Sequence, residues 1–382
     1  MHDAHGDFCV PLPVMYSNFS LSLLEWYQQN GRELPWRSTR DPYAIWLSEI
    51  ILQQTRVQQG WAYWERFMER WPTVEQLAAA SEDEVLRLWQ GLGYYSRARN
   101  LHTAARQIVE MGGFPASYEQ IRSLKGVGDY TAAAIASLAF NLPEAVVDGN
   151  VYRVLSRHFG IDTPINTTQG KKEFTALARQ LLPAPKAAAY NQAIMDFGAI
   201  QCTPQSPRCD QCPLQESCVA FREGRVEMLP VKLRKLEVKE RRLAYVYIRC
   251  NGETAIRRRG AGDIWQGLWE FLLVKDDLAQ ASVKDEPSNI SVKEKPSQTS
   301  VEVVGAQASA MTSQFSDLLK DALPVVKDFR HVLTHRVLLC DFYLLQAEEK
   351  PLLPEEYIWV RENELDHYAL PRMIELLLKK LP

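Results

Sequence analysis

The sequence predicts two domains of different class, an all-helical first domain and a mixed α+β second domain. The chain has 382 residues, more than one hydrophobic core usually holds. Apolar residues recur at helical spacing from Phe19 to Phe221, whereas from Leu243 onward they alternate with polar residues as in strands. The change of period near residue 240 places the domain border there.

The first domain, residues 19–221, follows an N-terminal extension of residues 1–18. Leu23, Trp26 and Tyr27 share one helical face, and the segments Ile45–Leu52 and Val85–Trp89 carry similar faces between Pro, Gly and Asp residues. A helix with one apolar face must bury that face against its neighbours. These segments therefore predict a compact helical bundle.

A basic connector, residues 222–241, precedes the second domain, residues 242–382. From Arg222 to Arg242 the chain has eight Lys or Arg residues against four Glu. The connector could lie along phosphates, or it could be a solvated charged linker. Predicted strands follow, closed by a helix over Pro371–Lys380, and a polar insert at about 276–314 is expected to be mobile. The predicted strands are Ala244–Ile248, Glu253–Arg258, Leu268–Val274, Val337–Leu345 and Tyr357–Val360.

Charge and cysteine content exclude several classes of protein. The formal net charge is −3, with −3 on residues 1–221 and none on the remainder, so neither half is a basic domain. Binding to nucleic acid would therefore have to come from local motifs. No run of 18 apolar residues and no signal peptide is visible, which predicts a cytoplasmic protein without a membrane span.

One glycine-containing motif, Leu124–Ile135, has the form of a helix-hairpin-helix turn. Gly126 and Gly128 allow a tight turn before a helix of small residues, and the amides at the start of that helix could bind a phosphate oxygen. Such a motif can also be an ordinary turn. The two interpretations stay open at this point.

Two acidic residues stand in unusual surroundings. Glu49 lies in the apolar helical segment Trp46–Thr55, where desolvation would raise the pKa of its carboxyl and suit a proton donor. Asp148 follows two valines and precedes Gly149 and Asn150. Asp148 could simply cap the next helix, and Glu49 could lie on an exposed helix edge.

Four cysteines lie within one short loop, with the spacing Cys-x6-Cys-x2-Cys-x5-Cys. Four thiolates can close around a tetrahedral zinc ion or an iron-sulfur cluster. Zinc ribbons usually pair two Cys-x-x-Cys knuckles, and this loop has one. The spacing therefore favours a cluster held by Cys202, Cys209, Cys212 and Cys218.

Taken together, these motifs resemble the endonuclease III superfamily of DNA glycosylases. Leu34–Arg37, Trp46–Thr55 and Gly91–Tyr95 are similar to the MutY-type adenine DNA glycosylases. The second half resembles the Nudix-like domain of that family through Trp265–Phe271 and Phe329–Arg336. The resemblance implies a helix-hairpin-helix glycosylase domain with a 4Fe-4S loop at residues 202–218, followed by an α+β Nudix-like domain.

The resemblance also implies a reaction. In this family, adenine mispaired with 8-oxoguanine or guanine is flipped out of double-stranded DNA and excised. Glu49 matches the general acid, and Asp148 matches the carboxylate that stabilises the sugar cation. Tyr130 and Asn150 match residues around the two carboxyls. Because Tyr130 stands where lyases carry a nucleophilic Lys, a monofunctional enzyme is expected.

Further residues match family positions that contact the substrate. The second domain shows no Glu-rich metal box and is expected to bind rather than hydrolyse, through a family Phe-Ser-His turn that here reads Leu333, Thr334 and His335. The adenine pocket matches Arg32, Trp36, Arg37 and Gln192, and the DNA-binding positions match Gln54, Thr55, Leu92, Tyr94, Lys125, Gly126 and Gly128. The family also implies a monomer in the bacterial cytoplasm, associated with the nucleoid.

Two other functions are weighed against this one. The first is a bifunctional glycosylase and lyase for oxidised pyrimidines, and both Tyr130 and the second domain argue against it. The second is a DNA-binding or iron-sulfur module without catalysis. Retention of both Glu49 and Asp148 argues against that module, since neither carboxyl is needed to hold phosphate.

Overall fold

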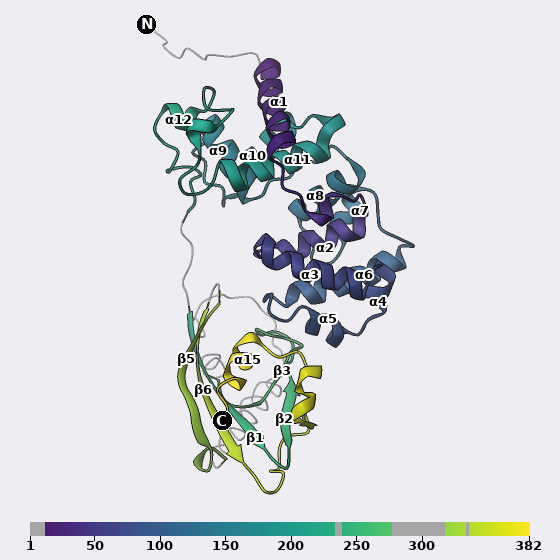
Figure 1. The fold of residues 1–382 in the computed structure, drawn as a ribbon, viewed down its shortest axis with the longest axis vertical. Helices are drawn as coiled ribbons and strands as arrows, with labels where there is room; N and C mark the ends of the chain where they lie inside the picture. The colour runs from purple at the N-terminus through teal and green to yellow at the C-terminus, as the bar shows by residue number, and fades with distance from the viewer. Residues whose placement is uncertain (1–11, 234–238, 277–317, 334–335) are drawn as a thin grey trace, which may run out of the picture. The chain divides into compact units, whose positions relative to one another are not determined.

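The computed structural model describes residues 12–233, 239–276, 318–333 and 336–382 (Figure 1). Internal contacts divide the chain into two compact units. Unit 1 contains residues 1–80 and 99–234, and unit 2 contains residues 81–98 and 235–382. The main border therefore falls inside the basic connector, and one short helical segment of the first half groups with unit 2.

Unit 1 is helical, and its described residues contain no strand. Polar caps start several of the helices: Asp41 accepts hydrogen bonds from the amides of Tyr43 and Ala44, and Thr73 forms a capping box with Gln76. The helices are α1 (Leu12–Asn30), η1 (Pro35–Arg37), α2 (Pro42–Leu52), α3 (Val57–Arg70), α4 (Val74–Ala79), α6 (Ser96–Glu110, which begins in unit 2), α7 (Tyr118–Ser123), α8 (Asp129–Phe140), α9 (Gly149–Phe159), α10 (Thr168–Leu181), η2 (Ala184–Lys186), α11 (Ala187–Asp196), η3 (Phe197–Gln201), η4 (Cys209–Gln211) and α12 (Val219–Arg222).

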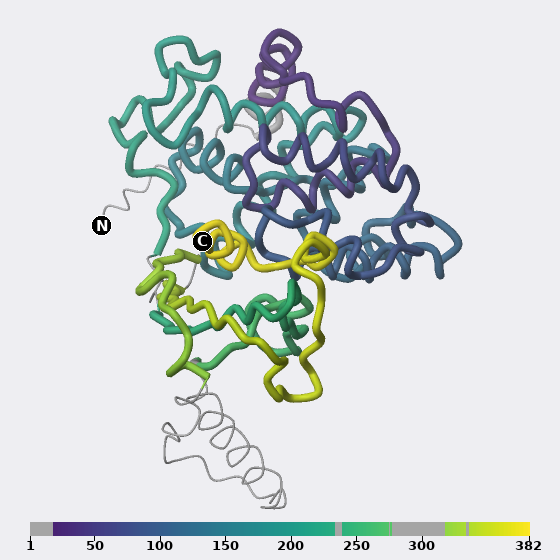
Figure 2. The backbone as a smooth tube through the Cα atoms, turned by 60° about the horizontal axis from the view of Figure 1, so that its bottom comes forward, coloured from purple at the N-terminus to yellow at the C-terminus, as the bar shows by residue number. Residues whose placement is uncertain are grey.

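Helix α8 lies in the middle of unit 1. All of its residues from Thr131 to Ala139 are buried, and the helix packs against α2, α7 and α11. Small side chains allow this close approach from several sides. Helix α1, purple in Figure 2, packs against α10 and α11. Leu23 of α1 therefore shares one hydrophobic core with Leu155 and Phe174.

Unit 2 contains two sheets and is of mixed class, which confirms the predicted α+β fold. The larger sheet has the strand order β4-β1-β6-β5, in which β1 and β6 run parallel and the other neighbours run antiparallel. The smaller sheet has the order β3-β2-β7. The elements are α5 (Glu82–Leu88), β1 (Lys239–Arg249), β2 (Glu253–Arg258), β3 (Trp269–Glu270), β4 (Leu272–Asp276), β5 (Leu323–Val332), β6 (Arg336–Gln346), β7 (Tyr357–Arg361), η5 (Glu362–His367) and α15 (Arg372–Leu378).

Strand β1 separates two cores of unit 2. Tyr245 and Tyr247 lie in one core with residues of α15, whereas Val246 and Ile248 lie in the other. Successive side chains of a strand point to opposite faces, so a central strand buried on both faces reads as an apolar run. Ala244–Ile248, predicted as a strand from a period-two pattern, is confirmed as part of β1, and it is buried on both faces.

Two features of unit 2 differ from the prediction. The expected strand Leu268–Val274 is wrong as one element, because the chain leaves the smaller sheet after Glu270 and enters the larger one at Leu272. Strand β5 was not predicted. It is an edge strand with Pro324 near its start and register irregularities up to Phe329, so its sequence lacks the regular alternation of an inner strand.

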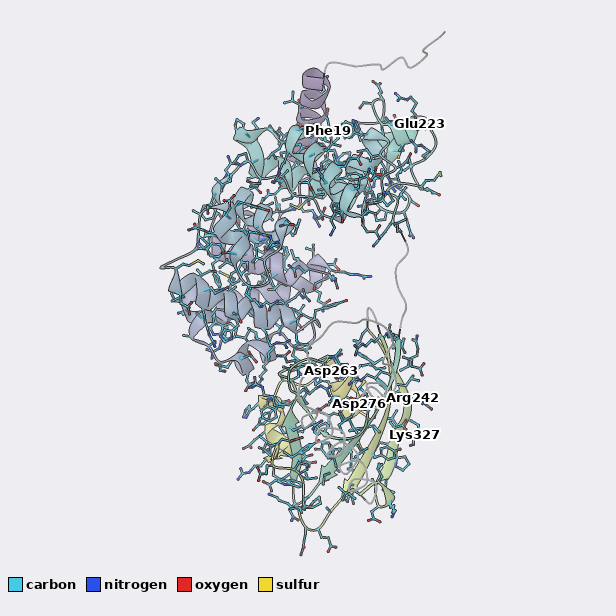
Figure 3. The ribbon with its side chains drawn as sticks, turned by 180° about the vertical axis from the view of Figure 1, so that it is seen from behind. Phe19, Glu223, Arg242, Asp263, Asp276 and Lys327 are labelled. Carbon is cyan, nitrogen blue, oxygen red and sulfur yellow. The ribbon has the colours of Figure 1, made fainter. Side chains whose placement is uncertain are left out.

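A buried ionic cluster lies at the start of β1. Arg241 bonds Asp263 and Asp276, which are labelled in Figure 3, and Arg259 bonds Asp263 and Glu270. The side chain of Arg241 is only 3% exposed, so its charge requires these partners. Among the described helices, none is both long and apolar enough to cross a membrane.

Candidate active site

Glu49 lies on α2 between Ser48 and Ile50, which are both buried. Residue Glu49 itself keeps partial exposure, but its carboxyl is surrounded by protein atoms. Burial raises the pKa of Glu49 to about 7, and the charge of Asp148 acts in the same direction. Hydrogen bonding with Tyr130 and the charge of Arg37 oppose this rise. Glu49 is therefore poised to hold and release a proton near neutral pH.

Tyr130 stands in the first turn of α8, beside Glu49. Its hydroxyl also lies 3.5 Å from the sulfur of Met195 on α11. Burial, the charges of Glu49 and Asp148, and the hydrogen bond to Glu49 hold the pKa of the phenol well above its ordinary value. Tyr130 therefore stays neutral and can donate its proton in hydrogen bonds.

Asp148 is the cap of α9. Its Oδ1 accepts hydrogen bonds from the amides of Asn150 (2.9 Å) and Val151 (2.8 Å), and its Oδ2 accepts from the side-chain amide of Asn150 (2.9 Å). Burial raises the pKa of Asp148, but these donors and the charge of Arg153 oppose the rise. Capping and a role in chemistry are thus compatible, because the same donors stabilise a negative charge at Asp148.

Arg153 holds the Asp148 turn against η3. Its guanidinium donates to Oδ1 of Asn150 and to the carbonyl oxygens of Gly198 and Cys202. A Cβ added at Gly198 would lie 2.7 Å from Cβ of Asn150, so only glycine fits this contact. The turn that carries Asp148 is consequently packed directly against the segment that leads into the cysteine loop.

A second polar group lies next to the carboxyls. Asp196, at the end of α11, bonds both Arg32 and Arg37 and is completely buried. Gln192, one turn earlier on α11, accepts a hydrogen bond from the hydroxyl of Tyr27 at 2.8 Å. Three of the four residues predicted for an adenine pocket therefore make side-chain contacts that involve α11. Arg32 and Arg37 bond to Asp196, and Gln192 bonds to Tyr27.

Trp36, the fourth predicted pocket residue, is buried in an aromatic cluster. Its ring packs edge-on against Trp61 at 6.0 Å and Trp64 at 5.7 Å between ring centroids. The indole of Trp64 also donates a hydrogen bond to the carbonyl oxygen of Ala44. Trp36 thus fixes η1 against α2 and α3, and through η1 it positions Arg37.

The predicted hairpin turn joins α7 to α8. Gly126 has a φ of +78°, and a Cβ there would lie 2.6 Å from Cβ of Asn100, so this position requires glycine. Gly128 caps α8 without any side-chain hydrogen bond. Lys125, Gly126 and Gly128 are all exposed. The backbone amides at this helix start can therefore be reached by an anion.

Two residues predicted to enter the DNA stack have strained backbones. Gln54 (φ +56°) is exposed just after α2, and Tyr94 (φ +47°) is 43% exposed directly after Gly93. Positive φ at such residues costs free energy and is typical of functional loops. Thr55 is partly buried, and Leu92 is buried, with Arg97 bonded to its carbonyl oxygen.

The predicted lesion-reading turn is only partly described. Leu333 follows β5, packs against the core shared by β1 and α15, and donates its amide hydrogen to the carbonyl oxygen of Arg336. Thr334 and His335 lie outside the described residues. The expectation for these two side chains therefore stays a prediction.

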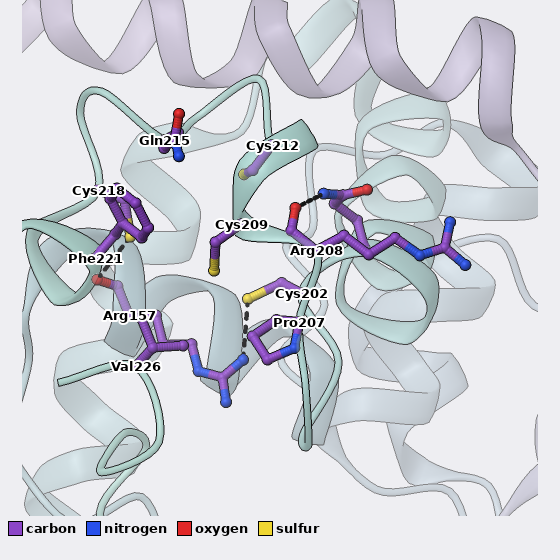
Figure 4. A pocket seen from close by; sticks show the side chains of 11 residues that line it. Arg157, Cys202, Pro207, Arg208, Cys209, Cys212, Gln215, Cys218, Phe221 and Val226 are labelled. Atoms are coloured by element: carbon purple, nitrogen blue, oxygen red, sulfur yellow. Dashed lines mark hydrogen bonds between the residues drawn. The ribbon is translucent and has the colours of Figure 1, made fainter. Parts of the chain in front are cut away.

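The four predicted cysteines line one small cavity together with Arg157 (Figure 4). A guanidinium nitrogen of Arg157 lies 3.4 Å from the sulfur of Cys202. Burial and the neighbouring thiols raise the pKa of Cys209 and Cys218 and bring that of Cys212 to about 12. Bound metal would remove this penalty, because it stabilises thiolates.

The donor set fits a cluster better than one ion. In the part of the chain that the structure describes, no three His, Cys, Asp or Glu side chains come close enough together to hold a metal ion. A single zinc ion needs its sulfurs at about 2.3 Å from one point. In a four-iron cluster each thiolate binds its own iron, so the sulfurs can stand farther apart.

Sequence reasoning missed three residues of this site. Asp196 is an acid in the buried run Ala193–Gly198, the same signal that pointed to Glu49. Tyr27 was recognised only as part of an apolar helix face, and its contact to Gln192 spans 165 positions of sequence. Arg153 was noticed only as part of a motif, and nothing local shows that it reaches η3.

Comparison with known families matches three parts of the chain. Residues 47–183 match the HhH-GPD superfamily of base excision DNA repair proteins. Residues 202–218 match the iron-sulfur binding domain of endonuclease III. Residues 244–380 match the NUDIX domain. These ranges correspond to the helical half, the cysteine loop and the α+β half.

Several relatives are named adenine DNA glycosylase. One from Buchnera aphidicola subsp. Schizaphis graminum is 35% identical over 256 residues, which cover 66% of this chain and 74% of the relative. The Mus musculus protein is 45% identical over 226 residues, covering 56% of this chain, and the match spans only 44% of that relative. The Schizosaccharomyces pombe protein is 27% identical over 92% of this chain and 87% of its own length.

Among solved structures, a thermostable thymine-DNA glycosylase has a TM-score of 0.51 and 32% sequence identity, covering 55% of this chain and 97% of its own. The cysteine loop matches an iron-sulfur binding domain, and its cofactor is a 4Fe-4S cluster. Given the Buchnera relative and the matched superfamily, this chain belongs to the adenine DNA glycosylase family of the HhH-GPD base excision repair superfamily.

Proposed function

We propose that the protein is an adenine DNA glycosylase. It removes adenine paired with 8-oxoguanine or guanine in double-stranded DNA by hydrolysing the N-glycosidic bond. The observation that carries this proposal is the pair Glu49 and Asp148, which interact in one buried site but have different surroundings. Glu49 has a pKa near neutrality, whereas Asp148 is surrounded by donors that favour its charged form.

The two carboxyls divide the work of the reaction. The base must first leave the stack, since an acid cannot reach it inside the duplex. Glu49 then gives its proton to N7 of adenine, so that the base leaves as a neutral molecule when the C1′–N9 bond breaks. Asp148 stabilises the positive sugar, and water adds to C1′ and gives up a proton, which returns to the ionised Glu49, to leave an abasic site. Tyr130 and Asn150 orient the two carboxyls.

The reaction ends at the abasic site. A phenol at position 130 cannot form the Schiff base that a lyase needs, and Lys125 is an exposed residue of the hairpin turn. We therefore propose a monofunctional enzyme, with Lys125 as a phosphate contact.

The other predicted residues complete the substrate site. Arg32, Trp36, Arg37 and Gln192 form the adenine pocket, although Trp36 contributes mainly by fixing η1. The DNA is bound by the hairpin turn and by the wedge residues, and 8-oxoguanine is read by the turn at residues 333–335. The wedge residues are Gln54, Thr55, Leu92 and Tyr94, and the lesion-reading residues are Leu333, Thr334 and His335.

We assign the cluster to Cys202, Cys209, Cys212 and Cys218. When bound, the cluster would supply a rigid cross-link within the loop, and its thiolates would be paired with the Arg157 guanidinium. The protein is expected to act as a monomer in the cytoplasm.

A single-turnover assay tests the function. Purified protein is mixed in excess with a duplex that contains adenine opposite 8-oxoguanine, and free adenine and strand breaks are both measured. We expect adenine release without strand cleavage. Strand cleavage that borohydride traps as a protein-DNA adduct would favour the bifunctional alternative. Duplex binding without base release would favour a non-catalytic module.

Two variants test the assigned roles. Glu49→Gln and Asp148→Asn should each lower the single-turnover rate by about 100-fold or more while leaving duplex affinity nearly unchanged. Asn is itself a good helix cap, so Asp148→Asn keeps the start of α9. Glu69→Gln on α3 is a matched control, because Glu69 is an exposed carboxylate of unit 1. Loss of binding in either variant would mean a structural role instead.

A further inference from the structure

Asp196 is an ion buried between two cations. Its side chain has no solvent exposure, and five donors surround its two oxygens. The backbone amide and the guanidinium of Arg32 supply three of the donors, with the amide at 2.9 Å and Nε at 2.8 Å. The guanidinium of Arg37 supplies the other two, at 2.6 and 2.8 Å. Removal of the carboxylate would leave these guanidiniums without their counter-charge.

Arg37 is the part of this cluster that faces the carboxyls. Its side chain is only 12% exposed, and it interacts electrostatically with Glu49, Tyr27 and Tyr130. Although burial alone would lower it, bonding to Asp196 raises the pKa of Arg37, which therefore stays charged. The positive charge of Arg37 acts to lower the pKa of Glu49, because it stabilises the ionised carboxylate.

Three groups from different elements act on Glu49. Tyr130 of α8 and Arg37 of η1 favour the ionised form, and Asp148 before α9 favours the protonated form. Asp196 comes from a fourth element, α11. It does not touch Glu49, but it pairs with the cation that does act on Glu49.

We propose that Asp196 is a positioning residue that holds Arg32 and Arg37 in place and screens the Arg37 charge from Glu49, so that Glu49 keeps its proton until adenine arrives. This inference rests on the proposed function, since it concerns the acid of that reaction. Asp196 does not contact the Glu49 carboxyl. Asp196 acts on Glu49 through the guanidinium of Arg37.

The pH dependence of the single-turnover rate tests this role. A general acid works only while it is protonated, so the rate falls as the pH rises through the pKa of Glu49. Asp196→Asn keeps the shape of the side chain and removes its charge. We expect the basic limb of the profile to move about one pH unit toward acid. Arg37→Gln removes the cation itself and should move the limb toward higher pH.

A matched control separates screening from a general effect of charge. Asp162→Asn removes a carboxylate of unit 1 that pairs with Arg225 at the surface, and its limb should coincide with that of the wild type. A purely structural role of Asp196 would lower the melting temperature or the rate at every pH without moving the limb. An unmoved limb in a folded Asp196→Asn protein would overturn the proposal.

A direct titration covers the remaining cases. If Asp196→Asn fails to fold, the shift in Arg37→Gln decides, and no shift there overturns the screening role. If the wild-type protein releases no adenine, the proposed function fails, but the Glu49 carboxyl can still be titrated by NMR of ¹³C-glutamate-labelled protein. A lower Glu49 pKa in Asp196→Asn than in the wild type supports the inference, and equal values overturn it.

Discussion

The hydroxyl of Tyr27 donates a hydrogen bond to Oε1 of Gln192 at 2.8 Å and so joins α1 to α11. Because the amide oxygen of Gln192 is fixed in this way, its amide nitrogen has one defined direction. Adenine carries acceptor nitrogens on its ring, which such an amide can recognise. Tyr27→Phe removes the hydrogen bond and lets Gln192 rotate.

We expect Tyr27→Phe to lower the single-turnover rate of adenine release about fivefold, the value of one ordinary hydrogen bond. Tyr43→Phe is the control, because Tyr43 is a buried phenol of unit 1, whereas Tyr27 is half-buried, and Tyr43 donates to the backbone oxygen of Trp71. That variant should lose stability and keep the wild-type rate at a temperature where it is folded. Equal rates for Tyr27→Phe and the wild type would remove Tyr27 from the pocket.

The wild-type enzyme should be most active below neutral pH. The pKa of Glu49 is about 7, and only the protonated form can act as the acid, so the rate should be lost as the pH rises through this value. Asp148 must be charged, and burial raises its pKa, so a second loss is expected at the acid end. A bell-shaped profile of the single-turnover rate checks both limbs.

Duplex affinity measured over the same pH range serves as the control, because the limbs should appear in the rate and not in the binding. A rate that keeps rising above pH 8 would mean that Glu49 acts as a base or not at all. The same profile in Glu49→Gln should lack the basic limb.

Local sequence patterns indicated some of the residues that the structure brings together. Glu49 was noticed as an acid in an apolar helical segment, and Asp148 was singled out by its match to the family motif. The structure brings the two into electrostatic contact. The hairpin turn was recognisable because the left-handed backbone at residue 126 needs glycine. The middle of strand β1, Ala244–Ile248, was predicted from a period-two pattern, and the structure confirms a strand there.

Contacts between distant segments could not be predicted in the same way. Asp196 meets Arg32 across 164 positions, and no local period reports such a pair. Edge strand β5 lacks regular alternation, because register irregularities between Pro324 and Phe329 change which side chains face the core. Unit 2 includes residues 81–98, although in sequence these residues look like any other helical segment of the first half.

The hairpin turn contains two glycines that differ in backbone conformation and in the space available to a Cβ atom. Gly126→Ala places a Cβ 2.6 Å from Asn100 at a φ of +78°, and should destabilise unit 1 by about 1 to 3 kcal/mol. Gly128→Ala has a φ of −93° and meets nothing within 4 Å, so it should cost no more than about 1 kcal/mol, the difference between Gly and Ala at a helix N-cap.

The DNA affinity of Gly128→Ala then isolates the role of the turn. If a phosphate approaches the exposed amides at the start of α8, the added methyl group should weaken duplex binding at a temperature where the variant is fully folded. Full affinity in Gly128→Ala would mean that the turn is structural only. Fluorescence anisotropy with a labelled duplex measures this difference.

Arg241 and Arg242 are neighbours on β1 in opposite surroundings. Arg241 is 3% exposed and bonded to Asp263 and Asp276, whereas Arg242 is 48% exposed and paired with Asp328. Arg241→Met should destabilise unit 2 by about 1 to 3 kcal/mol, because it removes a buried cation that pairs with two partly exposed carboxylates. Arg242→Met should cost less than about 1 kcal/mol. Calorimetry of the full chain measures both, and equal effects would show that water reaches the Arg241 cluster. Burial raises the pKa of Asp263, but the hydrogen bonds from Arg241 and from the amide of Ile264, together with the charges of Arg241 and Arg259, lower it to about 2. The contribution of this cluster should therefore be complete above pH 4 and lost as the pH falls through 2.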